Sequence, residues 1–117
     1  MAAGRFHLII DIRSIKKEIL TDEQRLSNFL VSLPPIIDMS ILAGPVIAQG
    51  IPENPGLSGF VIIDYSHISV HTFTEHGQAQ IDIFSCKDFD QEKAIAATLD
   101  YCQVTRDKAV TQVVGWK

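Results

Sequence analysis

Apolar and polar residues alternate along several stretches of this chain, which is the pattern of β-strands that bury one face. The pattern is clearest at residues 6–13, where every second side chain is apolar. It predicts further strands at 58–64, 67–73, 78–85 and 109–114. These strands are therefore expected to form one sheet.

One more strand-like stretch, residues 40–49, is interrupted by Gly44-Pro45. Proline cannot donate a hydrogen bond to a sheet, so this strand is expected at an edge or at a bulge. Residues 50–56, which include two prolines, are predicted to form a loop. Residues 75–77, Glu75-His76-Gly77, are predicted to connect two of the later strands as a hairpin.

Two segments have helical spacing instead. Residues 21–24 have the form of a capping box, and the apolar residues after them recur every three or four positions. This helix is predicted to end at about Leu33, because Pro34-Pro35 follows. Residues 15–20 show neither pattern and are expected to form an irregular turn.

Asp90 can cap a second helix, on which Ile95, Leu99 and Cys102 share a face. Residues 106–108 are then expected to turn the chain into the last strand. The predicted order of elements is βαβββαβ or close to it. This order predicts an α+β fold, a two-layer sandwich in which a mostly antiparallel sheet carries two helices on one face.

The composition fits one domain over residues 1–117, since 46% hydrophobic residues in a chain of this length can fill a single core. The net charge of −4 excludes a surface built to neutralise phosphates, so nucleic acid is not an expected partner. Apolar runs are far shorter than the roughly 20 residues of a membrane span, and no signal pattern opens the chain. We therefore expect a cytoplasmic protein with no membrane partner.

The two cysteines, Cys86 and Cys102, are expected to be free thiols, because a cytosolic chain with an ordinary core has little need of a disulfide. Histidines, cysteines and carboxylates do not recur at metal-site spacings, so no metal is predicted. Cys102 and Trp116 are expected to pack, Trp116 in the fold or at an interface, and no role can be argued for His67 or His76.

The candidate chemistry lies between residues 56 and 86. An apolar run at 60–63 leads into Asp64-Tyr65-Ser66-His67, where the strand pattern breaks. Polar residues between two β-rich runs are expected at a strand end or kink, where a hydroxyl can meet groups from other strands. Ser66 is therefore the first candidate for a reactive residue.

Several motifs in this region recur in a known family. They are Gly-x-Ser-Gly from Gly56, Ser-His-x-Ser-x-His-Thr from Ser66, Glu75, Asp-x-Phe-x-Cys ending at Cys86, and Asp90 with Lys93-Ala94. The chain resembles the short prokaryotic type of S-adenosylmethionine decarboxylase, a pyruvoyl-dependent enzyme made as a self-cleaving proenzyme. The resemblance is specific over about residues 56–94.

The resemblance implies that the chain is cleaved between Tyr65 and Ser66, and that Ser66 becomes the pyruvoyl group. Ser58 and His71 would assist this processing, and Cys86 would donate a proton during decarboxylation. The pyruvoyl group would form a Schiff base with S-adenosylmethionine, so that no pyridoxal phosphate (PLP) is needed. The product would supply spermidine and other polyamine synthesis, and the enzyme would be a homodimer with sites near its interface.

The same resemblance implies that Glu75 contacts the ribose of the substrate. Phe73 could stack on adenine or face the sulfonium. Tyr65 is a candidate substrate contact because it borders the reacting bond. Tyr65 stands where the family usually has glutamate, and Lys87 where glycine is usual.

The residue types suit the chemistry. A serine hydroxyl can attack the preceding carbonyl, and a donor such as Ser58 can stabilise the resulting oxyanion. An imidazole such as His71 can remove the α-proton, and a thiol such as Cys86 can protonate a carbanion. Two alternatives stay open: an uncleaved, silent relative that binds S-adenosylmethionine or regulates a partner, and a pyruvoyl decarboxylase acting on arginine.

Overall fold

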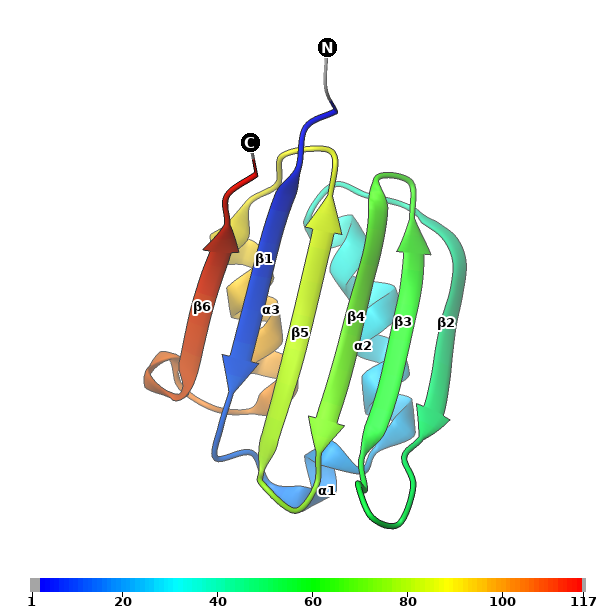
Figure 1. Cartoon of the computed structure of the whole chain (residues 1–117), viewed down its shortest axis with the longest axis vertical. Coiled ribbons are helices and arrows are strands. Elements are labelled where there is room, and N and C mark those ends of the chain that lie inside the picture. The colour runs from blue at the N-terminus through cyan, green and yellow to red at the C-terminus, as the bar shows by residue number, and fades with distance from the viewer. Residues whose placement is uncertain (1–2, 117) are drawn as a thin grey trace.

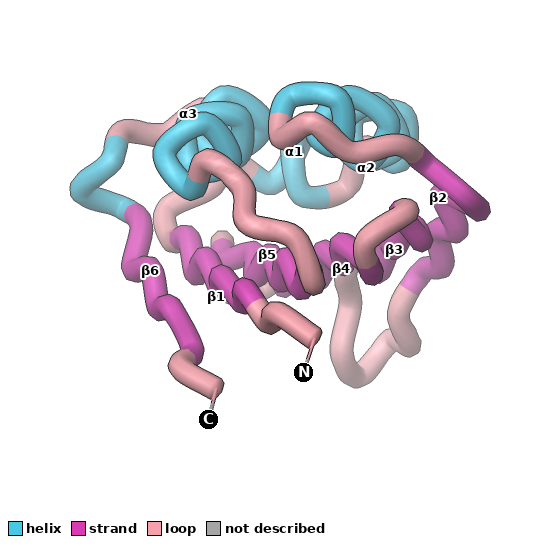
Figure 2. Tube along the Cα trace, turned by 90° about the horizontal axis from the view of Figure 1, so that it is seen from above, coloured by secondary structure: helices cyan, strands magenta, loops and turns pink. Residues whose placement is uncertain are grey.

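The computed structural model describes residues 3–116 and shows one six-stranded antiparallel sheet with helices on one face (Figures 1 and 2). The α+β two-layer prediction is thus confirmed. The strand order is β2-β3-β4-β5-β1-β6. In chain order the elements are β1 (Phe6–Ile12), α1 (Lys17–Leu20), α2 (Glu23–Ile36), β2 (Ile41–Gln49), β3 (Leu57–Ile63), β4 (Ser66–Phe73), β5 (Gln78–Ser85), α3 (Gln91–Cys102), a 3-10 turn η1 (Arg106–Lys108) and β6 (Ala109–Val114).

Two details of the predicted order are wrong. The order βαβββαβ has three strands between the two helices, whereas the structure has four, as the predicted strand ranges already did. Residues 17–20 form the short helix α1 rather than an irregular turn, because the backbone N–H groups of Leu20 and Thr21 bond back to the carbonyls of Lys16 and Lys17. One turn of helix is too short to show a 3.6-residue period in the sequence.

The predicted end of α2 at Leu33 is also wrong, since the helix continues through Pro34-Pro35 to Ile36. Proline removes a helical N–H but leaves its carbonyl free to accept. Here the carbonyl of Pro34 accepts from the N–H of Met39, and that of Pro35 from the N–H of Asp38. The two prolines therefore close the last turn of the helix instead of preventing it.

The predicted edge strand is β2. It pairs only with β3 within the described sheet, and its register shifts twice around Gly44-Pro45. The predicted start of α2 is right to within one residue, but the N-cap is Asp22, whose carboxylate accepts from the Arg25 N–H, and not Thr21, whose hydroxyl donates to the Lys17 carbonyl. Asp90 caps α3 in the same way as Asp22, through the Lys93 N–H. Both helix starts could thus be located to within one residue from their capping residues.

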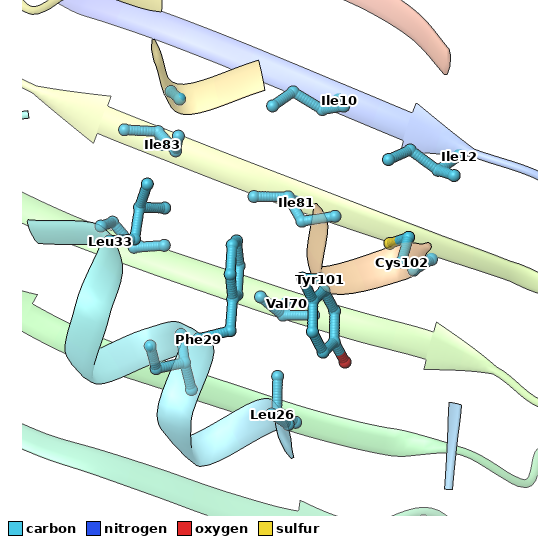
Figure 3. Close-up of a cluster of buried hydrophobic side chains, with 14 of the residues drawn as sticks. Ile10, Ile12, Leu26, Phe29, Leu33, Val70, Ile81, Ile83, Tyr101 and Cys102 are labelled. Atoms are coloured by element: carbon cyan, nitrogen blue, oxygen red, sulfur yellow. The ribbon is translucent and has the colours of Figure 1, made fainter. Parts of the chain in front are cut away.

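The hydrophobic core lies between the sheet and the two longer helices (Figure 3). Alternate residues of β1, β4 and β5 face it, among them Ile10, Val70 and Ile81. On α3, Cys102 is buried as predicted, but Leu99 is only partly buried and Tyr101 takes the central place. The Tyr101 ring stacks on Phe29 of α2 with centroids 4.6 Å apart.

The opposite face of the sheet carries no described helix (Figure 2). Three apolar side chains at its β2–β3 side are well exposed: Val46, Phe60 and Ile62, at 51%, 41% and 42%. No helix among the described residues is long and apolar enough to cross a membrane. This uncovered face is called the open face below, and the candidate residues Ser58 and His71 lie on it beside Val46 and Phe60.

A buried hydroxyl ties the helical layer to the sheet at one end of β4. The Thr72 hydroxyl donates to the Leu20 carbonyl at 2.9 Å and accepts from the Leu57 N–H at 2.8 Å. Gly56 is required beside it, because a Cβ there would lie 1.9 Å from the Thr72 carbonyl oxygen. The end of α1 and the start of β3 thus depend on one side chain.

We expect Thr72→Val to lower the free energy of unfolding by about 1–3 kcal/mol, because the isosteric change leaves the Leu57 N–H and Leu20 carbonyl without their partner. Urea denaturation measures this free energy of unfolding. Every protein in the comparison also carries Ser66→Ala, so that all chains are uncleaved. Thr111→Val on the edge strand β6 is the control and should change stability by less than about 0.5 kcal/mol. Equal losses in the two variants would contradict this account of Thr72.

Candidate active site

Ser66 is the first residue of β4, directly after the two-residue connection Asp64-Tyr65 from β3. It lies opposite Ile63 on β3 and Ser85 on β5. Its φ angle is +148°, a value that residues with a Cβ rarely adopt. Such backbone strain is concentrated at functional sites, where the surrounding structure holds it in place. The strained residue here is the serine whose peptide bond is the candidate for cleavage.

The carbonyl that this serine would attack is already hydrogen-bonded. The Tyr65 oxygen accepts from the backbone N–H of Cys86 at 2.9 Å. A donor aimed at a carbonyl oxygen withdraws electron density from its carbon and stabilises the negative charge that an attack creates. Tyr65, Ser66 and Cys86 are therefore brought together at one end of the sheet, and Cys86 is exposed there.

The Lys87 side chain packs on the ring of Tyr65, the residue directly before the candidate cleavage site. The Lys87 ammonium lies 5.0 Å from the centre of the Tyr65 ring and donates to the Asp38 carbonyl at 2.8 Å. A cation over an aromatic face is attracted by the ring's quadrupole. Tyr65 and Lys87, two of the positions where this chain departs from the residues usual in the family it resembles, are thus in contact with each other.

Ser58 and His71 form a second cluster, on the open face. They are register partners on β3 and β4, and the Ser58 hydroxyl lies 2.8 Å from His71 Nδ1. A hydroxyl and an imidazole at this distance can pass a proton between them. A cavity of about 420 Å³ adjoins the pair, and the other residues that line it are Val46, Ala48, Gly59, Phe60, His67 and Ser69.

The two clusters are far apart within one chain. His71 is five residues beyond Ser66 on β4, which separates their Cα atoms by about 16 Å at the usual rise of a strand. The structure therefore does not bring His71 or Ser58 to the Ser66 of the same chain. It brings Cys86 there instead.

Two of the expected substrate contacts, Phe73 and Glu75, follow His71 of the second cluster, whereas the third, Tyr65, lies in the first cluster. Phe73 ends β4, and Glu75 follows in the turn to β5. Glu75 lines a cavity of about 400 Å³ together with Lys17 and Thr21 of the α1 region and the loop from Gln49 to Leu57. Sequence reasoning missed Lys17, because residues 15–20 showed no pattern that placed them near a site, and it interpreted Thr21 only as part of a helix cap.

No sequence pattern predicted the cluster of side chains around His7 on the open face. Its Nε2 lies 2.8 Å from the Asp82 carboxylate, while its Nδ1 is buried without a partner among the described residues. Trp116 stacks on the His7 ring, and Phe84 meets it edge to face. Trp116 contacts this cluster but keeps 48% of its surface exposed, so both expected roles, packing in the fold and packing at an interface, stay open. His67 contacts the same group through Phe84.

The second cysteine is part of the core. Cys102 is buried, and burial raises the pKa of its thiol to about 12 despite the nearby Arg25. Burial likewise raises the pKa of the neighbouring Tyr101 hydroxyl above its ordinary value. Neither group can ionise near neutral pH. Among residues 3–116, no three metal-binding side chains of the His, Cys, Asp or Glu type gather into a possible metal site.

Comparison with known proteins identifies the family. The model of the family described as S-adenosylmethionine decarboxylase matches residues 6–111. The chain is 33% identical to the S-adenosylmethionine decarboxylase proenzyme of Archaeoglobus fulgidus over 103 residues, which are 86% of this chain and 87% of that one. It is 35% identical to a proenzyme of the same name from Clostridium botulinum Loch Maree over 97 residues, 82% of this chain and 81% of that one.

The fold has a solved counterpart as well. The crystal structure of the adenosylmethionine decarboxylase from Aquifex aeolicus VF5 superposes with a TM-score of 0.80 at 22% identity. The match covers 97% of this chain and 91% of the other. It supports the two-layer architecture described above.

We expect a thiol reagent such as iodoacetamide to label only Cys86 in the folded protein at pH 8. Cys86 is exposed, whereas the raised pKa of buried Cys102 leaves only about 1 thiolate in 10⁴ at that pH. Peptide mass spectrometry gives the labelled position, and labelling in denaturant, where both cysteines react, is the control. Rapid labelling of Cys102 in the folded chain would contradict the packing described here.

Proposed function

The chain belongs to the S-adenosylmethionine decarboxylase family, and we propose that it cleaves itself at Ser66 and then converts S-adenosylmethionine to decarboxylated S-adenosylmethionine and carbon dioxide. The product would be the aminopropyl donor for spermidine synthesis. One observation carries the proposal: the Tyr65 carbonyl accepts the Cys86 N–H directly before a serine with a φ of +148°. The backbone of Ser66 is thus strained, and the carbonyl that its hydroxyl would attack is polarised.

Cleavage begins with a shift of the Tyr65 acyl group from nitrogen to oxygen. The Ser66 hydroxyl oxygen bonds to the Tyr65 carbonyl carbon, and the hydroxyl proton passes to the Ser66 nitrogen as the carbon–nitrogen bond breaks. The product is an ester with a free amino group on residue 66. The Cys86 N–H stabilises the oxyanion formed on the way, so this donor acts in the first step.

The ester is then eliminated. An imidazole removes the α-proton of residue 66, the bond from Cβ to the ester oxygen breaks, and Tyr65 departs as a carboxylate. The dehydroalanine left at residue 66 tautomerises to an imine, and water hydrolyses it to a ketone with release of ammonia. The second piece then begins with a pyruvoyl group.

The residues around position 66 fit a pyruvoyl group, because they leave a thiol exposed beside the strained backbone. Once bound to the substrate amine, this group supplies the electron sink for the loss of carbon dioxide. The Cys86 thiol then donates the proton that replaces the carboxylate. Phe73 and Glu75 lie beyond His71 on the chain, so in the shared site described below Glu75 of the second copy would bind the ribose and Phe73 of the second copy would border the adenosine. Tyr65 would border the methionine part.

The separation of the two clusters supports a shared site in a symmetric dimer. His71 lies about 16 Å from Ser66 along one strand, too far for an imidazole to reach the α-proton. The open face exposes Val46, Phe60 and Ile62, which a second sheet would bury. If two copies pair by these faces about a twofold axis, the Ser58–His71 pair of one chain can lie over Ser66 of the other.

We expect the purified protein to consist of two pieces of about 65 and 52 residues, counted on either side of the Tyr65–Ser66 bond. Intact mass spectrometry should show the smaller piece with a pyruvoyl start. Ser66→Ala should remain one chain of 13.0 kDa, because it has no attacking hydroxyl.

Cys86→Ala is the matched variant. It keeps the backbone N–H and should still cleave, while losing most release of carbon dioxide from S-adenosylmethionine. An uncut wild-type chain that still binds S-adenosylmethionine would favour a silent relative over the enzyme. A cleaved chain that decarboxylates arginine instead would keep the processing and change the substrate.

The shared site is tested by complementation. Ser66→Ala and His71→Ala chains with different tags should each stay uncut when expressed alone. When they are expressed together, the His71→Ala chains should be cleaved in mixed dimers, because the Ser66→Ala partner supplies the imidazole. Cleavage of His71→Ala alone, or no cleavage in the mixture, would exclude this arrangement.

A further inference from the structure

A fully buried hydroxyl closes the turn that presents Cys86. Ser85 ends β5 with no exposed surface. Its hydroxyl donates to the Lys87 carbonyl at 2.7 Å and accepts from the Lys87 N–H at 3.0 Å. A serine hydroxyl can do both at once, since it has one proton and two lone pairs. The residue enclosed by this turn is Cys86.

Cys86 is thereby held from two sides. On one side the Ser85 hydroxyl fixes both backbone groups of Lys87. On the other side the Cys86 N–H points at the Tyr65 carbonyl, and Ser85 is itself the register partner of Ser66. Rotation of the peptide between Ser85 and Cys86 would break the bond to Tyr65, and the Ser85 hydroxyl opposes such a rotation.

We propose that Ser85 is a positioning residue for self-cleavage: its hydroxyl aims the Cys86 N–H at the Tyr65 carbonyl and keeps the Cys86 thiol beside residue 66. This rests on the proposed function, because the N–H acts on the oxyanion of the acyl shift. Threonine can replace the hydroxyl, and the Met39 sulfur 3.8 Å away is a flexible neighbour that can move for the added methyl group. Alanine cannot replace it.

A purely structural role would have a different signature. Thr98 is also fully buried, and its hydroxyl donates to the Ala94 carbonyl at 2.8 Å within α3, away from the candidate site. Thr98→Val therefore removes a buried hydroxyl without touching the turn at Cys86. Any effect common to Ser85→Ala and Thr98→Val comes from lost stability, and only the excess in Ser85→Ala reports on positioning.

The first measurement is the rate of self-cleavage of freshly translated chains, followed by gel or mass. Ser85→Ala should cleave about tenfold more slowly than the parent, because one well-placed hydrogen bond is worth about a factor of ten. Ser85→Thr should recover a rate within about threefold of the parent, and Thr98→Val should cleave at the parental rate. Parental cleavage by Ser85→Ala, or equal slowing by Thr98→Val, would overturn the proposal.

The second measurement does not depend on activity. Amide hydrogen exchange by NMR in the uncut Ser66→Ala chain reports on the Cys86 N–H itself. Ser85→Ala should speed exchange at this amide about tenfold, Ser85→Thr should restore it, and Thr98→Val should leave it unchanged. Unchanged exchange in Ser85→Ala would overturn the proposal. Faster exchange in a protein that never cleaves would support the positioning while removing the proposed function.

Discussion

The antiparallel register of β4 against β5 determines where the reactive groups of this chain lie. Ile68 pairs with Ile83 and Val70 with Ile81, and all four side chains are buried against the helices. A shift of one residue would turn these side chains to the open face, so the core strongly selects one register. The same register places Ser66 opposite Ser85, and hence the Tyr65 carbonyl within reach of the Cys86 N–H. The packing of these core residues thus sets the geometry of the site, although they are not part of it.

Local features of this fold could be predicted from the sequence, and non-local ones could not. The strands, the approximate start of α2 and the cap at Asp90 follow from periodicity and side-chain chemistry within a few residues. The helix α1 has too few residues to show a period, and the end of α2 depends on carbonyl partners beyond Pro35. The Tyr65–Cys86 hydrogen bond joins residues 21 positions apart, which no local pattern reveals.

The distance between Ser66 and His71, in contrast, could have been predicted from the sequence. Both residues were expected on or beside one strand, and five residues of strand span about 16 Å. The two residues belong to one motif and suit one chemistry, but the rigid strand between them keeps them apart. Groups on one strand of a sheet are held at fixed distances and cannot approach each other. Equivalent groups of two chains can meet only where the surfaces of the two chains pack together. The open face, which carries exposed apolar side chains, is the surface available for this.

The strand order also determines whether the two pieces of a cleaved chain would stay associated. A break after Tyr65 divides the sheet into β1, β2 and β3 on one polypeptide and β4, β5 and β6 on the other. These strands are interleaved, since β1 lies between β5 and β6 and β3 lies beside β4. The two polypeptides would therefore stay together as one particle without a covalent link. Assembly of the sheet must come before the break, because each polypeptide alone holds only one pair of neighbouring strands, β2-β3 or β4-β5, and its third strand lies elsewhere in the sheet.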